Sequence, residues 1–148
     1  NVHNLLYAYS PSETKDEIEF LERYPGDDYV DIVGYDCYAT GSDSVAVANY
    51  KIALSHNLNI VTSYAQKLGK LPVIGETGME AIPYPTYFTE AVYPIISQYK
   101  IGWVLFWRNA WKTDMPNHFY VPFEGHSSAP DFKEFVAKPD ILMNVDIK

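Results

Sequence analysis

The stretch Leu71-Pro-Val-Ile-Gly-Glu-Thr-Gly78 is a short apolar run that ends abruptly on a glutamate. Pro72 fits the first position of a strand, where its missing N–H costs least. Val73 and Ile74 show no polar alternation, as expected for a parallel strand covered on both faces. Glu76 stands where this strand ends, and α/β barrels keep their catalytic groups at the C-terminal mouths of their strands. A glutamate that caps a helix or pairs with an arginine is the alternative, and this stretch alone slightly favours it.

The composition restricts the class of partner. The chain has 148 residues and 47% of them are apolar, which is enough for one domain or one piece of a larger one. Its formal net charge of -8 argues against nucleic acid or an anionic membrane surface. Aromatic residues make up 16% of the chain, including 13 Tyr and 3 Trp. Their flat faces with polar tips suit stacking on sugar rings, although a Tyr-rich core and surface would give the same composition.

Several other site classes find no support in the sequence. Cys37 is the single cysteine, so an internal disulfide is excluded, and its neighbours predict a small buried residue rather than a catalytic thiol. No run reaches the roughly 18 apolar residues of a membrane span. The four histidines show neither H-E-x-x-H nor another paired spacing, so we expect no metal site. Asp27-Asp28 fits turn chemistry better than a calcium site. His118 and His126 are either cleft residues or, more simply, solvated loop residues.

Strand and helix signals alternate along the chain. The apolar runs predict strands at 4–9, 30–38, 71–76 and 101–107. Start and stop signals predict helices from Ser12 or Thr14 to Glu22 and from Ser42 or Asp43 to about Leu68. Residues 55–59 are a candidate interruption of the second helix. Further helices are expected near 87–99 and 131–136, with a polar aromatic loop between 108 and 125.

This alternation predicts an α/β fold, and the spacing of about 37 residues per unit fits strand–helix units of an eightfold barrel. Four parallel strands also fit an open doubly wound sheet. Nothing in the chain reads G-x-G-x-x-G or G-x-x-x-x-G-K, so no nucleotide cofactor is expected. A half-barrel would leave its first and fourth strands as open edges. We therefore expect residues 1–148 to be one part of a single catalytic domain whose other half is missing from this chain.

Polar and aromatic groups follow three of the predicted strands at the same end. Asp36 and Tyr38 are two residues apart and point the same way, Glu76 ends the next strand, and Trp107 and Arg108 end the last one. Each has a plain structural alternative as a loop cap, a core residue or a surface ion pair. Their conjunction at the end of the strands where such folds bind ligands is more informative than any one of them.

These residue types suit a glycosidase. Retaining hydrolysis needs a nucleophilic carboxylate and a second carboxyl as acid and base, about 5–5.5 Å apart. Glu76 is the candidate nucleophile, oriented and kept ionised by a Tyr hydroxyl. Trp107 would form an apolar floor under a sugar ring, and Asp36 and Arg108 would bind sugar hydroxyls.

Four segments carry a resemblance to a known family. They are Asn4-Leu-Leu-Tyr-Ala-Tyr-Ser-Pro11, Tyr24-Pro-Gly-Asp-Asp-Tyr-Val-Asp-Ile-Val-Gly-Tyr-Asp-Cys-Tyr38, Leu71–Gly78 and Val104-Leu-Phe-Trp-Arg-Asn-Ala110. In order and spacing they resemble glycoside hydrolase family 26, the endo-β-1,4-mannanases, over nearly the whole chain, with Bacteroides-type members nearest.

The resemblance implies strands five to eight, the C-terminal half, of a retaining (β/α)8 TIM barrel. It implies that Glu76 is the nucleophile, that Tyr38 orients it, and that Asp36, Trp107 and Arg108 bind substrate. The family's acid/base Glu follows a His at the end of strand four, and no His-Glu pair occurs here. We therefore expect that carboxyl in the absent half, and we expect the segment alone to be inactive.

The expected function is cleavage of internal β-1,4 bonds in mannan or galactomannan, with no cofactor. A polymeric substrate implies a secreted, periplasmic or cell-surface enzyme. A β-1,3/1,4-glucanase on the same scaffold and a non-catalytic glycan-binding protein remain the alternatives.

Overall fold

The structure forms a parallel wall in which each of the four predicted strands pairs with the next predicted strand along the chain. The computed structural model describes residues 4–110 and 114–143. The first predicted strand contributes β1 (Ala8–Tyr9), the second β2 (Ile32–Val33) and β3 (Asp36–Ala39), the third β4 (Leu71–Pro72) and β5 (Ile74–Met79), and the fourth β6 (Val104–Phe106). Their orders are β1-β2-β4 and β3-β5-β6, and every pairing among these strands is parallel.

The two short sheets are continuous in their hydrogen bonding. The Gly75 N–H donates to the Tyr35 carbonyl at 3.0 Å and the Val73 N–H to the Val33 carbonyl at 2.9 Å, across the breaks that separate β2 from β3 and β4 from β5. The breaks are therefore bends within the two predicted strands. The predicted first strand is shorter than expected, because only its last two residues pair.

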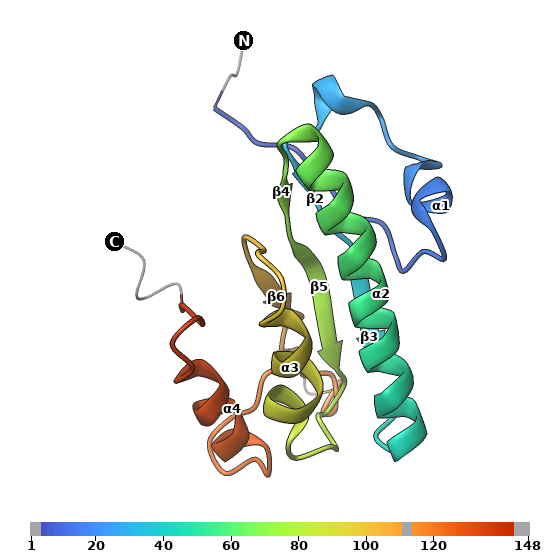
Figure 1. The fold of residues 1–148 in the computed structure, drawn as a ribbon. Coiled ribbons are helices and arrows are strands. Elements are labelled where there is room, and N and C mark those ends of the chain that lie inside the picture. Colours follow the sequence, from blue (N-terminus) through green and yellow to red (C-terminus); the bar gives the residue numbers. More distant parts are fainter. Residues whose placement is uncertain (1–3, 111–113, 144–148) are drawn as a thin grey trace.

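The helices follow the same sequential order on one side of the strands (Figure 1). They are α1 (Glu17–Leu21), α2 (Ser44–Leu68), α3 (Tyr93–Ile96) and α4 (Ala129–Val136), with a 3₁₀ turn η1 (Asp27–Tyr29) and a π-helical turn η2 (Tyr87–Val92). Helix α2 packs against β2, β3 and β4, and it also contacts α1, η2 and α3. A doubly wound sheet reverses its strand order at a switch point. The described strands show no such reversal, and this arrangement is that of a barrel wall with its outer helices.

Capping residues explain where two helices begin. The Asp16 carboxylate accepts the Glu19 N–H and caps α1, so the predicted caps Ser12 and Thr14 were wrong. The Asp43 carboxylate accepts the N–H groups of Val45 and Ala46 and caps α2. Helix α2 is unbroken through residues 55–59 and ends at Gly69, whose φ of 65° is the left-handed conformation that glycine adopts most easily.

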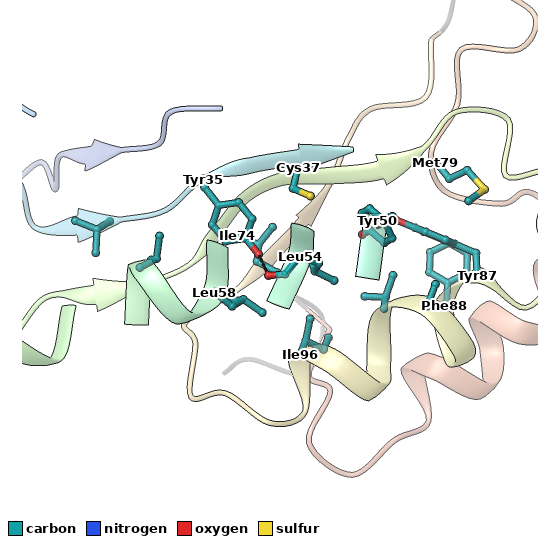
Figure 2. Packing of buried hydrophobic residues seen from close by; sticks show 14 of the residues in the cluster. Tyr35, Cys37, Tyr50, Leu54, Leu58, Ile74, Met79, Tyr87, Phe88 and Ile96 are labelled. Atoms are coloured by element: carbon teal, nitrogen blue, oxygen red, sulfur yellow. Dashed lines mark hydrogen bonds between the residues drawn. The ribbon is translucent and has the colours of Figure 1, made fainter. Parts of the chain in front are cut away.

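The core lies between the strands and α2 (Figure 2). Tyr35 between β2 and β3, Ile74 of β5, and Leu54 and Leu58 of α2 are fully buried. The Tyr35 hydroxyl donates to the Leu54 carbonyl at 2.9 Å, and this bond attaches the second predicted strand to α2. Cys37 is also fully buried, as the sequence predicted. Within the described ranges, no helix has the length and apolar character needed to cross a membrane.

Replacing Asp43 with Ala should lower the free energy of unfolding by about 1 kcal/mol, because two N–H groups at the start of α2 lose their acceptor. Urea denaturation of the protein that carries this chain measures the change. Asp43→Asn keeps an acceptor oxygen and should stay close to wild type. Equal losses in both variants would contradict the capping role.

Candidate active site

The register between β3 and β5 decides which side chains meet. Asp36 lies opposite Glu76, Cys37 opposite Thr77, and Tyr38 opposite Gly78. Neighbouring residues of a strand point to opposite faces of a sheet. Cys37 and Thr77 are completely buried on the side of the helices, whereas Asp36, Tyr38 and Glu76 are half-buried on the other side. Three predicted site residues therefore share the face of the wall that the helices do not cover.

Tyr38 and Glu76 are in direct contact. The Tyr38 hydroxyl donates to Glu76 Oε2 at 2.7 Å. Burial, followed by this bond to the carboxylate and its charge, raises the pKa of Tyr38 well above its ordinary value. The phenol therefore keeps its proton at neutral pH and acts as a donor. A hydrogen bond to an ionised carboxylate is stronger than a neutral one and fixes the direction of the carboxylate.

Glu76 does not end its strand, which corrects the position predicted for it. Strand β5 continues to Met79, so the residues on both sides of Glu76 belong to the ladder. The sequence placed the end too early because Gly75 and Gly78 are weak strand formers that the neighbouring strands nevertheless hold extended. A carboxylate on a paired backbone is held more rigidly than one on a free loop.

Asp36 belongs to a second polar contact beside Glu76. The Ser10 hydroxyl donates to Asp36 Oδ1 at 2.8 Å. Burial raises the pKa of Asp36 and the charge of Glu76 raises it further, while the Ser10 bond opposes both. Gly75 makes room for this contact, because a Cβ atom there would lie 2.0 Å from Ser10 Oγ and 2.8 Å from Asp36 Oδ1.

The fourth strand is shorter than the predicted range 101–107, because β6 ends at Phe106, and Trp107 and Arg108 directly follow it. The Trp107 N–H donates to the Thr77 carbonyl at 3.0 Å, which brings the start of this loop beside β5 next to Glu76. Trp107 is half-buried and Arg108 is exposed. Among the described residues, no hydrogen bond connects either side chain to Glu76. The structure thus pairs Tyr38 with Glu76 closely, sets Asp36 opposite Glu76, and places Trp107 and Arg108 at the edge of the same region.

Sequence reasoning missed Tyr120. Its ring lies edge-on to the Tyr38 ring, with centroids 5.6 Å apart, and covers Gly78 so closely that a Cβ there would lie 2.4 Å from Tyr120 Cδ1. Asn109 fixes the segment, since its Oδ1 accepts the N–H groups of Tyr120 and Val121 at 2.9 and 3.0 Å. The only signal in the sequence was an Asn directly after Trp107-Arg108, a residue type that often bonds to loop backbone.

His118 and Glu80 form a polar contact next to Tyr120. His118 Nδ1 lies 2.8 Å from Glu80 Oε1, and the His118 ring lies edge-on to Tyr120 at 5.3 Å. His118 therefore lies beside the site, whereas His126 packs against Phe119 and Phe123. Ala81 and Ile82 follow with φ values of 57° and 44°, which are strained for residues with a side chain.

The chemistry of this arrangement centres on one carboxylate. A glutamate held by a phenol, beside a second carboxyl and aromatic rings, is suited to nucleophilic attack at a sugar carbon. Across residues 4–110 and 114–143, no group of three His, Cys, Asp or Glu side chains is arranged to hold a metal ion.

Comparison with known proteins gives the family. The chain is similar to a mannan endo-1,4-beta-mannosidase of Bifidobacterium adolescentis, with 35% identity over 80 residues, which is 53% of this chain and 8% of that protein. Among solved structures, it is similar to the GH26 beta-mannanase BoMan26A of Bacteroides ovatus, with 38% identity and a TM-score of 0.88 over 98% of this chain and 40% of that one.

GH26C of a Muricauda species is also similar, with 32% identity and a TM-score of 0.84 over 98% of this chain and 39% of that one. The chain thus spans about 40% of the length of these solved relatives, and its fold is the corresponding segment of their barrels. The family model of glycosyl hydrolase family 26 matches residues 1–111, well over half of the sequence. The chain therefore belongs to glycosyl hydrolase family 26.

Proposed function

We propose that the protein containing this chain hydrolyses internal β-1,4-mannosidic bonds of mannan or galactomannan with retention of configuration. The hydrogen bond from Tyr38 to Glu76, in a segment of a family 26 barrel, is the observation that carries the proposal. The printed names of the Bifidobacterium and Bacteroides relatives, a mannan endo-1,4-beta-mannosidase and a beta-mannanase, support the choice of mannan.

Glu76 is the nucleophile in this proposal. The Tyr38 hydroxyl engages Oε2 and limits rotation of the carboxylate, so that Oε1 can be directed at the anomeric carbon. Attack forms a covalent glycosyl–enzyme and releases the leaving sugar, and water then hydrolyses the ester with a second inversion. Because the pKa of Tyr38 is raised, its hydroxyl keeps its proton and can donate a hydrogen bond to Glu76 in the free enzyme.

The acid/base carboxyl is proposed to come from the half of the barrel outside this chain. Asp36 is a poor candidate for that role because it accepts a hydrogen bond from Ser10 and lies directly beside the nucleophile in the register. Without a general acid, the leaving sugar departs unprotonated, at a typical cost of about 10²–10⁴-fold in rate. The segment alone is therefore expected to be catalytically poor.

Substrate binding is proposed for Asp36, Trp107 and Arg108. Trp107 offers a half-buried aromatic face, which suits stacking against the apolar face of a sugar ring. Arg108 is exposed beyond it and would donate to hydroxyls of a more distant sugar. The proposed mechanism uses protein carboxyls and water, so it requires no cofactor.

The proposed place of action is outside the cytoplasm, in the periplasm, on the cell surface or in the medium. The reason is the substrate, since a mannan polymer must be shortened before a cell can take it up.

Replacing Glu76 with Ala in the full-length enzyme should lower turnover of mannan by roughly 10⁴-fold or more, because no nucleophile remains for the covalent step. Reducing-sugar release from mannan and from mixed-linkage glucan measures the activity of each variant. Glu134→Ala removes an exposed glutamate that pairs with Lys138 and is the matched control.

Mass spectrometry after a 2-fluoro mannosyl inactivator should place one label on Glu76. Near-normal turnover in Glu76→Ala would contradict the assignment. Faster hydrolysis of mixed-linkage glucan than of mannan would show that glucan is the substrate. Binding of mannooligosaccharide without labelling or hydrolysis would indicate a glycan-binding protein.

Replacing Tyr38 with Phe should lower kcat by about 10 to 100-fold, since a hydrogen bond to a charged group contributes about 1.5–3 kcal/mol. Steady-state kinetics on mannohexaose measures the change. Tyr84→Phe is the matched control, because Tyr84 also donates to a glutamate, Glu90, but on the exposed side of η2. A kcat equal to that of the control would show that the Tyr38 bond does not serve the reaction.

A further inference from the structure

A chain of three buried hydroxyls lies on the opposite face of β5 from Glu76. The Tyr87 hydroxyl donates to the Tyr50 hydroxyl at 2.8 Å, the Tyr50 hydroxyl lies 2.7 Å from Thr77 Oγ1, and Thr77 Oγ1 donates to the Cys37 carbonyl at 2.8 Å. Figure 2 shows Tyr50 and Tyr87 directed toward each other beside the core residues of β5. Thr77 and Tyr87 are fully buried and Tyr50 is 3% exposed.

The three protons of this chain have one consistent arrangement. Thr77 gives its proton to the Cys37 carbonyl, so the bond between Tyr50 and Thr77 must use the Tyr50 proton, and the bond between the tyrosines uses the Tyr87 proton. Burial raises the pKa of both tyrosines, so both keep their protons. Each donor in the chain is satisfied, as buried polar networks require.

The three hydroxyls lie directly behind the candidate active site, on the other face of β5. Thr77 lies opposite Cys37 in the register, between the pair Asp36–Glu76 and the pair Tyr38–Gly78. Its hydroxyl therefore connects β5 to β3 at the level where, on the other face, the Tyr38 hydroxyl meets Glu76. A shift of β5 along β3 would break both contacts together.

The outer end of the chain is also fixed. Tyr87 is the first residue of η2, and the Phe88 N–H donates to Asp131 Oδ2 of α4 at 2.8 Å. Thr89 also donates to the Asp131 carboxylate through its hydroxyl. The three hydroxyls thus connect the turn η2, through Tyr50 of α2, to strands β5 and β3. Phe and Val side chains would fill the same volume in an apolar core, where a polar network brings little net stability over a well-packed apolar one.

We propose that Thr77, Tyr50 and Tyr87 form a hydroxyl clamp that positions Glu76 against Tyr38 during catalysis. These three are positioning residues, which act through the β3–β5 register and do not touch the substrate. The inference rests on the function proposed above for Glu76.

The test uses Thr77→Val in the full-length enzyme, which removes the central hydroxyl at nearly constant volume. We expect kcat to fall about tenfold and KM to change by less than about twofold, because misplacing a reacting group by a fraction of an ångström affects the chemical step more than binding. Thr77→Ser restores a hydroxyl and should recover kcat to within about twofold of wild type. In a Tyr38→Phe background, Thr77→Val should lower kcat by less than about threefold, because the contact that it positions is already absent.

Two control variants separate positioning from stability. Thr62→Val removes a hydroxyl that bonds to the Leu58 carbonyl within α2, and Tyr35→Phe removes a buried hydroxyl that bonds to the Leu54 carbonyl. Tyr35→Phe should lower the thermal midpoint as Thr77→Val does, and both controls should leave kcat unchanged. Equal kcat losses in the controls, no recovery by Ser, or full additivity with Tyr38→Phe would each overturn the clamp. A wild-type enzyme that hydrolyses no β-glycan would overturn the proposed function and the clamp together, whereas an active wild type with unchanged kcat in Thr77→Val would overturn the clamp alone.

Discussion

The in-register parallel pairing of β3 with β5 is the constraint on which the site depends. It places Asp36 beside Glu76 and Tyr38 within 2.7 Å of the same carboxylate, although Tyr38 and Glu76 are 38 residues apart in the chain. Because side chains alternate along a strand, a slip by one residue would exchange Glu76 with Thr77. It would direct a carboxylate into the apolar core and a hydroxyl into the site. The free-energy cost of burying an unpaired charge therefore disfavours the slipped register and keeps Glu76 in the site.

The two faces of these strands are under different requirements. Toward the helices, Tyr35, Cys37 and Ile74 are fully buried and contribute to the core. On the other face, Asp36 and Glu76 are close enough for the charge of one to raise the pKa of the other. Carboxylates placed together in this way destabilise the ionised state of the folded protein, so the core on the helix side has to compensate for them. Such a separation of roles is the usual arrangement of enzymes on barrel scaffolds.

Periodicity and strand-end chemistry were sufficient to predict the alternation of strands and helices, the long helix after Asp43 and the position of Tyr38 and Glu76 at one edge of the strands. These features depend on local patterns, such as an unbroken apolar run or a two-residue spacing, that the sequence displays directly. The choice of a barrel over an open sheet and the direct contact of Tyr38 with Glu76 came from the family resemblance. Ser10 and Tyr120 could not be predicted, because Ser10 reaches Asp36 only through the pairing of the segment after β1 with β3, and Tyr120 lies in a loop whose path depends on distant contacts. Gly75 and Gly78 gave a misleading sign of a strand end, since their role is to admit Ser10 and Tyr120 at close range rather than to break the strand. The cap of α1 was missed because three residues of capping type, Ser12, Thr14 and Asp16, lie within five positions and their types alone do not rank them.

The sequential order of the strands has a consequence for how the protein is made. Counted as the four predicted strands, each pairs with the one before it in the chain: β2 with β1, β4 and β5 with β2 and β3, and β6 with β5. Helix α2 packs on strands that flank it directly in the sequence. A segment leaving the ribosome therefore meets a partner that has already been synthesised, and folding can proceed from the N-terminal side. The contact between Tyr38 and Glu76 joins β3 to β5, and α2 is the one helix between them in the sequence. The central element of the site can thus form during translation, before Trp107 and Tyr120 have been added to the chain.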